Sequence, residues 1–458
     1  MKKIITLIFI ISLPFISTAS HLRCGYISVK RPSSTSLTCQ ITLTVFVNSG
    51  SGVVFGNGLL SFGDGSSPLL VPGTEAVNRP DLGPNIGEAT FTVEHPYAGP
   101  GQYIIGYTET SRNGGIINFD NPLSTTFYIE TTINLDPFLG AYNTPEFLID
   151  PFFISKLGDN LSLSIGAYSP KDFVITYERS TPLRGKGIAV SNYRMPENFR
   201  VNPHNGLITW DTRYLDGYYA GEYLFAVKIH LSKYIDGNLY RLCTMLRDFQ
   251  IILVEDQPGG VISDNVSLDE NNRIYLPEGS SKTIKLFYEP NLSENTSLGA
   301  FSILSDNQDA FSFTTYDSAE AGIKVGVLTL TSNSTIARDN PYMITIRGTH
   351  TTENNTLFAS DIAYMFYTRD LYPEIITRTE DTVEGITLTP NPVSDYLKVQ
   401  LPYQQPTLLI LLDLAGKIVL KKIIDASCWV DVRELPSGLY LVEVRTPGAR
   451  KSIKIIKH

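Results

Sequence analysis

The sequence predicts an all-β protein built from tandem β-sandwich modules, and three observations support this. Apolar and polar residues alternate in short runs such as 41–47 and 323–330, which is the period-two pattern of half-buried strands. The 35 Gly and 27 Pro residues separate these runs as turn signals. Aromatic residues are frequent, only 18% of residues are charged, and runs with helical period are almost absent. We therefore expect helices only as single turns.

The N-terminus has the pattern of a signal peptide for export. Two lysines precede an apolar run at residues 4–16, and the small residues that follow allow cleavage before Ser20 or His21. We therefore assign residues 1–20 to a signal peptide. No later stretch reaches the ~18 to 20 apolar residues of a spanning helix, so we expect no transmembrane span in the mature chain.

Charge and motif content argue against several functional classes. The formal net charge is −9, and removal of the two signal-peptide lysines from 37 basic residues leaves 35 against 46 acidic ones. The mature chain therefore lacks the basic surface of a nucleic-acid-binding protein. The six His residues are scattered, and the sequence contains no zinc-binding, nucleophile-elbow or P-loop motif. We predict no catalytic residue, no metal ligand and no cofactor, and hence a protein that is not an enzyme.

Cysteine spacing leaves one disulfide open. Of the four cysteines, only Cys24 and Cys39 are close in sequence. A turn at residues 32–36 would fold the flanking strands against each other, but the sequence does not fix their register. A Cys24–Cys39 bridge is therefore an open alternative.

The first module, residues 21–132, carries two turn motifs. Gly63 and Gly65 flank Asp64 and permit positive φ in a tight turn that the carboxylate can cap. Downstream, His95 opens a His-Pro-Tyr strand entry that a Pro-Gly-Gln-Tyr run follows. Together these residues resemble the PKD-type immunoglobulin-like (Ig-like) domain. Asp64 and His95 would also suit a catalytic or metal pair, but without a third ligand nearby we interpret them as structural.

The second module, residues 133–255, continues the strand pattern. With the first module it resembles the paired N-terminal region of Bacteroidetes surface proteins associated with gliding motility, which implies PKD and cadherin-like folds. In that family an Asp-Pro-Asp-Gly-Asp run suited to calcium follows an Ala-Tyr pair. Here Ala167 and Tyr168 precede Ser-Pro-Lys-Asp, whose single carboxylate disfavours calcium and leaves its binding open. We interpret Trp210 as a core residue rather than a sugar-stacking one.

A third module is expected at residues 261–378. It follows a Gln-Pro-Gly-Gly linker that ends at Gly260. Strand spacing alone predicts an Ig-like β-sandwich, since no family motif is evident. A polar spacer at residues 378–384 separates it from the last module.

Residues 384–458 carry a series of signals in a fixed order. The segment opens with Asn-Pro, continues with an Asp-x-x-Gly-Lys hairpin and a Leu-x-x-Gly-x-Tyr strand, and ends on a short Lys-containing strand. The residues concerned are Asn391, Pro392, Asp413, Gly416, Lys417, Leu435, Gly438, Tyr440 and Lys454. This order resembles the small β-sandwich C-terminal sorting domain of the type IX secretion system, the outer-membrane export route of Bacteroidetes. The resemblance implies an extracellular or cell-surface protein, with the secretion machinery as partner of this domain. Whether the domain is cleaved or anchored stays open.

Three functions are compatible with this organisation. We favour a non-enzymatic secreted or cell-surface protein that acts in adhesion or surface interaction, with a glycan or a protein as ligand. The alternative is a carbohydrate-binding surface protein, which would use exposed aromatic rings. A secreted hydrolase is the third hypothesis, because two carboxylates in a cleft would suffice and the sequence has 46 Asp and Glu residues.

Overall fold

The computed structural model describes the chain in segments that begin at Leu22. They are residues 22–33, 36–51, 54–83, 85–158, 160–169, 173–213, 219–235, 238–255, 260–263, 274–289, 300–305, 307–318, 323–338, 341–351, 357–369, 386–401, 407–413, 417–424, 427–446 and 449–458. The expected signal peptide, residues 256–259 of the linker and the spacer at 378–384 lie outside them. Within the described segments the secondary structure consists of strands and of 3-10 helices of three residues each, which confirms the predicted fold class.

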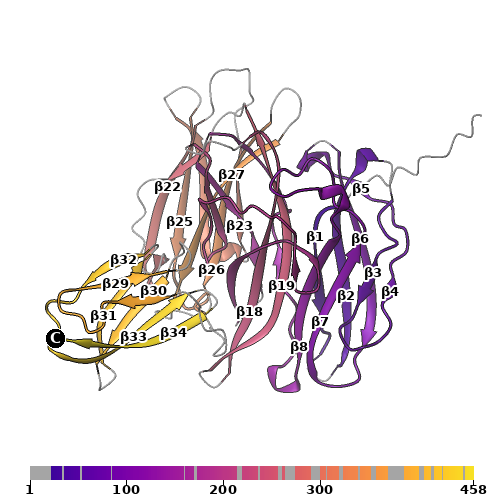
Figure 1. Cartoon of the computed structure of the whole chain (residues 1–458). Coiled ribbons are helices and arrows are strands. Elements are labelled where there is room, and N and C mark those ends of the chain that lie inside the picture. Colours follow the sequence, from indigo (N-terminus) through magenta and orange to yellow (C-terminus); the bar gives the residue numbers. More distant parts are fainter. Residues whose placement is uncertain are drawn as a thin grey trace, which may run out of the picture.

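The first module is a sandwich of two sheets (Figure 1). One sheet has the order β1-β2-β6-β5, and β7 and β8 with β3 and β4 form the facing layer. The strands are β1 (Leu22–Lys30), β2 (Thr38–Asn48), β3 (Leu59–Ser61), β4 (Leu69–Leu70), β5 (Val77–Asn78), β6 (Ile86–Pro96), β7 (Gly101–Glu109) and β8 (Phe127–Leu135). Its 3-10 helices are Ser49–Ser51, Pro80–Leu82 and Pro122–Ser124. Alternating residues of β2, including Ile41, Leu43 and Val45, are fully buried between the sheets, as the period-two pattern predicts.

The second module contributes the longest strands of the chain. Its elements are the 3-10 helix Pro137–Leu139 and the strands β9 (Glu146–Phe147), β10 (Phe152–Lys156), β11 (Asn160–Ser164), β12 (Ala167–Tyr168), β13 (Phe173–Ser180), β14 (Leu183–Gly185), β15 (Ile188–Ala189), β16 (Phe199–Val201), β17 (Leu207–Asp211), β18 (Gly221–Ile235) and β19 (Asn238–Val254). Trp210 is fully buried, with its ring 5.4 Å from that of Phe225, which confirms its interpretation as a core residue.

The β18–β19 hairpin joins the first two modules into one body. The sheet order β13-β18-β19-β8-β7 runs without interruption from one module into the other, and Cys243 of β19 pairs with Ile133 of β8. The distal half of the hairpin supplies Leu231 and Leu242 to the first core, while Phe249 belongs to the second. The boundary proposed between residues 132 and 133 therefore falls inside β8, because two sandwiches share one sheet.

Charged side chains are buried where the first two modules meet. Arg112 and Asp248 form an ion pair of 2.7 Å with both side chains fully buried. The Gln250 side chain joins two neighbours. Arg23 donates to its amide oxygen at 3.2 Å, and its amide nitrogen donates to Asn113 at 2.9 Å. Removal of one member of such a buried set would leave an unpaired polar group, which is strongly destabilising. The network therefore fixes how the modules meet.

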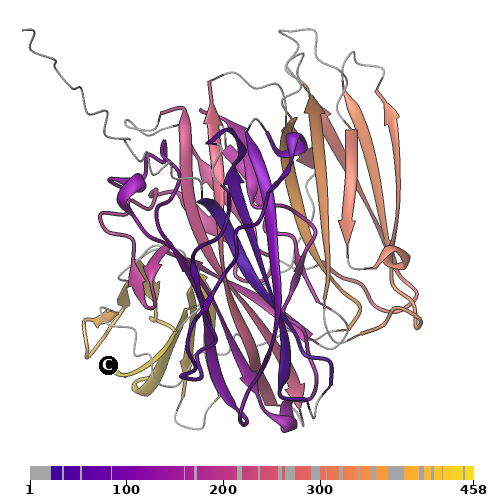
Figure 2. The same ribbon diagram turned by 90° about the vertical axis from the view of Figure 1, so that its right-hand side faces the viewer.

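The third module is a separate two-sheet sandwich with its own core, and it packs against the second module (Figure 2). Its sheets have the orders β20-β22-β25-β24 and β21-β27-β26-β23. The elements are β20 (Gly260–Ser263), β21 (Ile274–Tyr275), β22 (Ser281–Glu289), β23 (Ala300–Ser305), the 3-10 helix Gln308–Ala310, β24 (Phe311–Asp317), β25 (Lys324–Thr331), β26 (Tyr342–Thr351) and β27 (Leu357–Tyr367). Asp361 is fully buried, pairs with Arg347 at 2.8 Å and accepts from the Ser164 N–H at 3.0 Å. This contact ties the module to β11.

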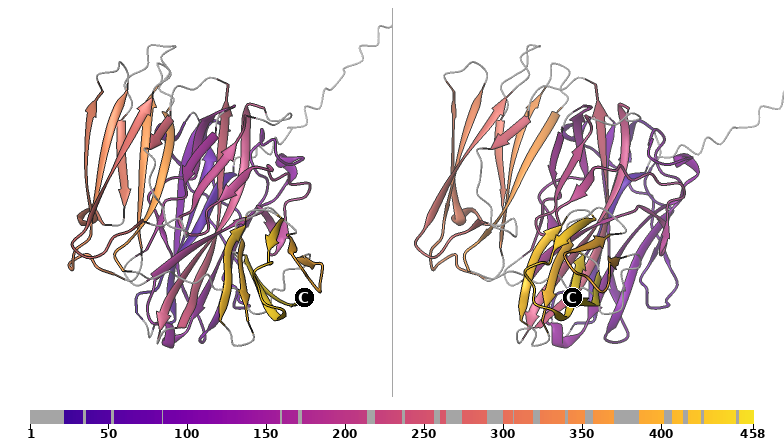
Figure 3. Two further views of the ribbon diagram at one scale, coloured as in Figure 1. Left: turned by 90° about the vertical axis from the view of Figure 1, so that its left-hand side faces the viewer. Right: turned by 60° about the vertical axis from the view of Figure 1, so that its left-hand side comes forward.

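The last module is a small sandwich at the C-terminus, coloured yellow in Figure 3. Its sheets have the orders β28-β29-β32 and β31-β30-β33-β34. The strands are β28 (Thr387–Thr389), β29 (Tyr396–Gln400), β30 (Thr407–Leu412), β31 (Ile418–Ile424), β32 (Cys428–Asp431), β33 (Gly438–Thr446) and β34 (Ala449–Lys457). Its core cluster is composed only of residues from this module, such as Leu409, Val442 and Ile455.

The Cys24–Cys39 bridge that the sequence left open does not form. Both thiols are free and buried. The strand register explains why, because Cys24 lies opposite Phe46 while Cys39 lies opposite His95 on the other neighbouring strand. Phe46 and Cys39 are seven positions apart on β2, about 23 Å at the usual rise, whereas a disulfide requires Cα atoms within about 7 Å.

Candidate functional site

The final strand β34 forms the edge of the larger sheet of the last module. It pairs with β33 along its whole length, from Ala449 opposite Thr446 to Lys457 opposite Gly438. Alternation places Ile455 in the core and Lys454 on the surface. Lys457 is buried, and its ammonium donates to the carbonyl of His458. Lys454 is thus the exposed cation of this strand among the side chains that the structure describes.

Asn391 explains why an Asn-Pro pair opens this domain. Its Oδ1 accepts from the Ile456 N–H and its Nδ2 donates to the Lys454 carbonyl, both at 2.9 Å. The side chain therefore replaces a neighbouring strand and satisfies two backbone groups of the β34 edge. Val393 continues the contact, because its N–H donates to the Ile456 carbonyl at 2.8 Å. The opening of the domain covers the outer edge of its last strand.

The hairpin motif is closed by Asp413. The Lys417 N–H donates to its carboxylate at 2.9 Å, and the Asp413 N–H donates to the Lys417 carbonyl at 3.0 Å. An aspartate that caps its own turn in this way stabilises a tight connection. Gly416 lies outside the described residues.

The Leu-x-x-Gly-x-Tyr motif forms the entry to β33. Leu435 packs against the core of the module, and Tyr440 is buried with its hydroxyl donating to the Pro436 carbonyl at 2.8 Å. Gly438 begins the strand between them. The opening Asn391 and Pro392, the Leu-x-x-Gly-x-Tyr residues and Lys454 are therefore brought together around β33 and β34, whereas Asp413 and Lys417 close the turn between β30 and β31.

Asp64 and His95 of the first module are in contact, as the turn motif and the strand entry meet. The two side chains are 2.7 Å apart, and Asp64 also accepts from the Ser66 N–H at 3.0 Å, as predicted for a turn cap. Gly63 and Gly65 have φ of 81° and 85°. Burial opposes ionisation, but the hydrogen bonds from Ser66 and His95 lower the pKa of Asp64 to about 2.

The ring of His95 stacks on Phe62 with centroids 3.8 Å apart. Tyr97 meets the same ring edge-on, and its hydroxyl donates to the Phe62 carbonyl at 3.1 Å. The pair is thus held in an aromatic cluster that ties the Gly-Asp-Gly turn to the strand entry. Among the residues that the structure describes, no group of three or more His, Cys, Asp or Glu could hold a metal ion.

A polar cleft of about 630 Å³ lies where the first two modules meet. Its floor is one face of the sheet formed by β13, β18, β19, β8 and β7. β8 pairs with β19 only as far as Met245. Beyond that point the two strands diverge: β19 pairs with β10, and Tyr128 of β8 pairs with Leu183 of β14. The cleft lies at this fork, lined by Leu246 of β19, Glu130 of β8 and Leu183.

Hydrogen bonds connect the cleft floor across the sheet. His230 contacts Thr244 through Nδ1 at 2.9 Å and Glu178 through Nε2 at 3.3 Å. Lys228 donates to Glu178 at 3.0 Å, and Arg241 donates to Thr244 at 3.4 Å. A carboxylate only accepts, so in the neutral imidazole Nε2 donates to Glu178 and Nδ1 accepts from Thr244.

The charges of this network are set by burial and by the neighbours. Burial lowers the pKa of His230 to about 4, against the opposing influence of Glu178. Burial would raise the pKa of Glu178, but the hydrogen bond from His230 and the charge of Lys228 lower it to about 2. At neutral pH the floor therefore holds a neutral histidine and an ionised glutamate paired with a lysine.

Sequence reasoning missed this cleft. The signal available was the alternation in β18, where Lys228 and His230 separate the buried residues Val227, Ile229 and Leu231. Such a pattern marks one polar face of a strand. It does not show that β13, β19 and β8 bring further polar residues to the same face, because those pairings join distant segments.

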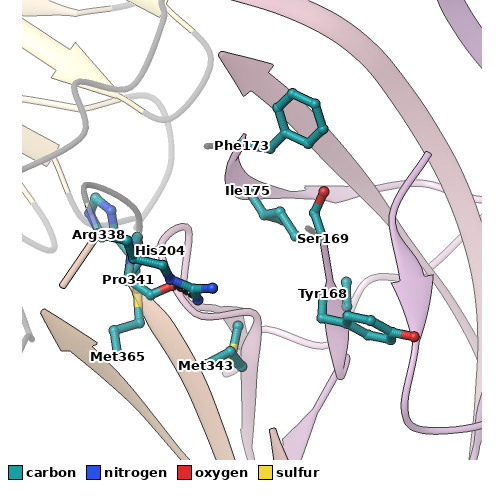
Figure 4. A pocket seen from close by; sticks show the side chains of 10 residues that line it. Tyr168, Ser169, Phe173, Ile175, His204, Arg338, Pro341, Met343 and Met365 are labelled. Carbon is teal, nitrogen blue, oxygen red and sulfur yellow. Dashed lines mark hydrogen bonds between the residues drawn. The ribbon is translucent and has the colours of Figure 1, made fainter. Parts of the chain in front are cut away.

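A second cavity, of about 30 Å³, lies between the second and third modules (Figure 4). His204 and Ser169 line it together with Arg338 and Met343. Burial lowers the pKa of His204 to about 4. The volume admits only a couple of water molecules. Lys171 and Asp172, which stand at the point expected for the calcium-binding run, lie outside the described residues.

No helix among the described residues has the length and apolar character needed to span a membrane. No curated protein sequence is significantly similar to the chain. Among solved structures, mouse protocadherin-24 EC1-3 is 14% identical, with 69% of this chain and 93% of that chain covered and a TM-score of 0.18. Drosophila N-cadherin EC1-4 is 13% identical, with 88% and 92% covered and a TM-score of 0.19.

A third similar structure is SGBP-B from the mixed-linkage glucan utilization locus of Bacteroides ovatus, in complex with a mixed-linkage heptasaccharide. It is 13% identical, with 68% of this chain and 69% of that chain covered and a TM-score of 0.13. With TM-scores this low, none of these similarities supports a functional conclusion.

The C-terminal segment gives a specific match. Residues 387–458 match the family described as secretion system C-terminal sorting domain. The match covers the last module, where Asn391 holds β34 and Asp413 closes the hairpin. Residues 387–458 thus form a C-terminal sorting domain, and the protein is cargo that the type IX secretion system exports to the cell surface or the extracellular space.

Proposed function

We propose that the exported protein is a non-enzymatic surface-interaction protein, in which the three upstream modules form the binding body and the sorting domain delivers it. The observation that carries this proposal is the polar cleft of about 630 Å³ at the junction of the first two modules. Binding sites of this size commonly lie between domains. The shared sheet and the buried Arg112–Asp248 pair hold the cleft walls in a fixed arrangement.

Carbohydrate binding is the second candidate. Stacking on sugar rings requires aromatic side chains gathered on one surface. The exposed aromatic residues of the described upstream modules lie at separate places along the chain instead, at Phe138, Tyr219, Tyr234, Tyr275 and Tyr316. The cleft therefore supports recognition by hydrogen bonds and charge rather than by an aromatic platform.

Hydrolysis has weaker support. Glu130 and Glu178 both line the cleft, as the hydrolase hypothesis would require. A general acid needs a raised pKa, so that it is protonated at working pH. The pKa of Glu178 is instead lowered to about 2, and its carboxylate is engaged by Lys228 and His230. We therefore propose binding without turnover.

The test is a binding screen with the exported protein. Protein purified from the surface or the medium is probed on arrays of glycans and of extracellular proteins, with the products analysed by mass spectrometry. The proposal predicts retention of a restricted set of ligands, recovered unchanged. Absence of any specific ligand, or cleavage of the bound glycans, would contradict it.

A further inference from the structure

We infer that the outer face of the sheet β28-β29-β32, in the sorting domain, binds a flat saccharide chain by ring stacking. The inference goes beyond the proposed function, which concerns the upstream modules. It follows from two exposed aromatic rings on one sheet face, from the polar groups around them and from the contacts that hold them in place.

Strand register brings the two rings together. Lys398 of β29 lies opposite Trp429 of β32, and Tyr396 lies opposite Asp431 on the same pair of strands (Figure 1). Tyr396 and Trp429 are therefore diagonal neighbours. Such positions are about 7 to 8 Å apart, within reach of aromatic side chains. One ligand can thus contact both rings.

Both rings are open to solvent, because the opposite face of this sheet forms the core of the domain. Leu397 and Val430, which alternate with the aromatic positions, are buried. Tyr396 and Trp429 are 44% and 59% exposed. Large rings exposed next to each other mark a binding surface more often than rings exposed singly.

The described residues that pair around the rings on this face are polar. Thr389 of β28 lies opposite Lys398, and Thr387 lies opposite Gln400. These side chains provide hydroxyl, ammonium and amide groups that donate or accept hydrogen bonds. An apolar protein surface would leave them unsatisfied, which is unfavourable. A sugar ring suits the face better, because it combines an apolar C–H face for stacking with hydroxyl groups at its edge.

Neighbouring charges hold the two rings in place. The Arg433 guanidinium lies 5.1 Å from the centroid of the Tyr396 ring and pairs with Asp431 at 2.7 Å. The Lys398 ammonium lies 5.8 Å from the centroid of the Trp429 ring. Side chains that are already ordered lose little conformational freedom on binding. The rings therefore form a prepared platform on a sheet, which matches an extended, ribbon-like chain better than a coiled one.

The experiment uses the fluorescence of the two tryptophans in the sequence. Trp210 is fully buried, so acrylamide quenches mainly the exposed Trp429. The full chain, with its sorting domain shown to be intact by mass spectrometry, is titrated with cellohexaose, a flat β-1,4-linked chain, and with maltohexaose, a coiled α-1,4-linked one. We expect cellohexaose to protect Trp429 from acrylamide in a saturable manner, and maltohexaose to bind several-fold more weakly.

Substitutions then assign the binding to the face. In isothermal titration, Trp429→Ala should weaken cellohexaose at least about tenfold, as expected for the loss of one stacked ring, and Tyr396→Ala should weaken it several-fold. Trp429→Phe keeps a ring and should retain part of the affinity. Tyr316→Ala is the matched control, because it removes a ring that is 50% exposed on β24 of the third module, and it should bind as the wild type does.

Absence of protection by cellohexaose, or an equal loss of affinity in Tyr316→Ala and Trp429→Ala, would overturn the inference. Dimers of the full chain that Trp429→Ala abolishes, detected by sedimentation, would also overturn it, since a second copy would then be the occupant. The substitutions leave the upstream cleft unchanged, so the proposed surface-interaction function does not depend on either result.

Discussion

The Asn391 side chain hydrogen-bonds the edge of β34 as a neighbouring strand would. Its amide makes two hydrogen bonds of 2.9 Å to the backbone of β34. Asn391→Ala removes both, so the free energy of unfolding of the sorting domain should fall by about 1 to 2 kcal/mol. Thermal unfolding followed by circular dichroism measures this loss. Asn391→Asp keeps the acceptor for Ile456 but sets a carboxylate oxygen against the Lys454 carbonyl, so it should not restore the wild-type midpoint. Equal midpoints for all three proteins would contradict the assigned role.

His230 predicts a pH dependence of stability. Its pKa is about 4 in the folded protein, because burial disfavours the charged ring, against an ordinary value of 6.5. The unfolded chain therefore takes up a proton first as pH falls, and stability is lost between about pH 6.5 and 4. Glu178 stays ionised over that range, since its pKa is lowered to about 2.

Replacement of this histidine isolates its contribution. When the pH falls from 6.5 to 4, the free energy of unfolding should decrease less for His230→Gln than for the wild type. The two decreases should differ by up to about 3 kcal/mol. Urea titrations at fixed pH values measure the difference. Parallel pH profiles for the two proteins would show that His230 is not buried as a neutral ring.

Local residue patterns were the most predictable from sequence. The Gly63-Asp64-Gly65 turn and the burial of Trp210 depend on neighbouring residues and on residue type, and both are confirmed. The Cys24–Cys39 disulfide depends on strand register, which a one-residue shift changes completely. The structure puts these cysteines opposite different partners, so proximity in sequence was not informative.

The β18–β19 hairpin is the element on which both upstream cores depend. Leu242 of β19 is fully buried in the first core, although it belongs to the second module in sequence. Leu242→Ala should therefore destabilise the first module by about 2 to 5 kcal/mol, the usual range for a buried leucine. Denaturant unfolding, read by proteolysis of the first module, measures the effect. Leu70→Ala, at a position 59% exposed on β4, is the control and should change little.

The sequence predicted the positions of strands better than it predicted which strands pair. The alternation in residues 41–47 and 323–330 correctly indicated β2 and β25, because period two is a property of the strand itself. The cleft could not be predicted, since it depends on β8 leaving β19 beyond Met245 and pairing with β14. Such a fork joins residues more than fifty positions apart, and no local pattern encodes it.

At the scale of the whole molecule, the chain should unfold in two parts. The first two modules share a sheet and the third is tied to them through Asp361, so we expect residues 22–369 to unfold as one cooperative unit. The sorting domain has its own core and should unfold separately. Calorimetry should resolve two transitions, of which only one persists when residues 384–458 are deleted. Three or more transitions would show that the modules are energetically independent.

The number of sandwiches could be estimated from length and turn signals, but their connection could not. A soft prior of one domain for every ~100 to 200 residues predicted three or four modules. That the first two merge follows from the length of β18 and β19, with 15 and 17 residues, which are long enough to reach from one core into the other. Motif order, by contrast, sufficed to identify the sorting domain, because its residues lie close in sequence.

Cell fractionation shows whether the C-terminal domain directs export. Full-length protein is compared with a chain lacking residues 451–458 and with Lys454→Glu, which alters an exposed residue of β34. The control is Lys422→Glu, which alters an exposed residue of β31 in the same sheet. We predict that the truncated chain accumulates in the periplasm with its upstream modules folded, that Lys454→Glu is exported less, and that Lys422→Glu reaches the surface as the full-length protein does. Surface display of the truncated chain at the full-length level would contradict the account.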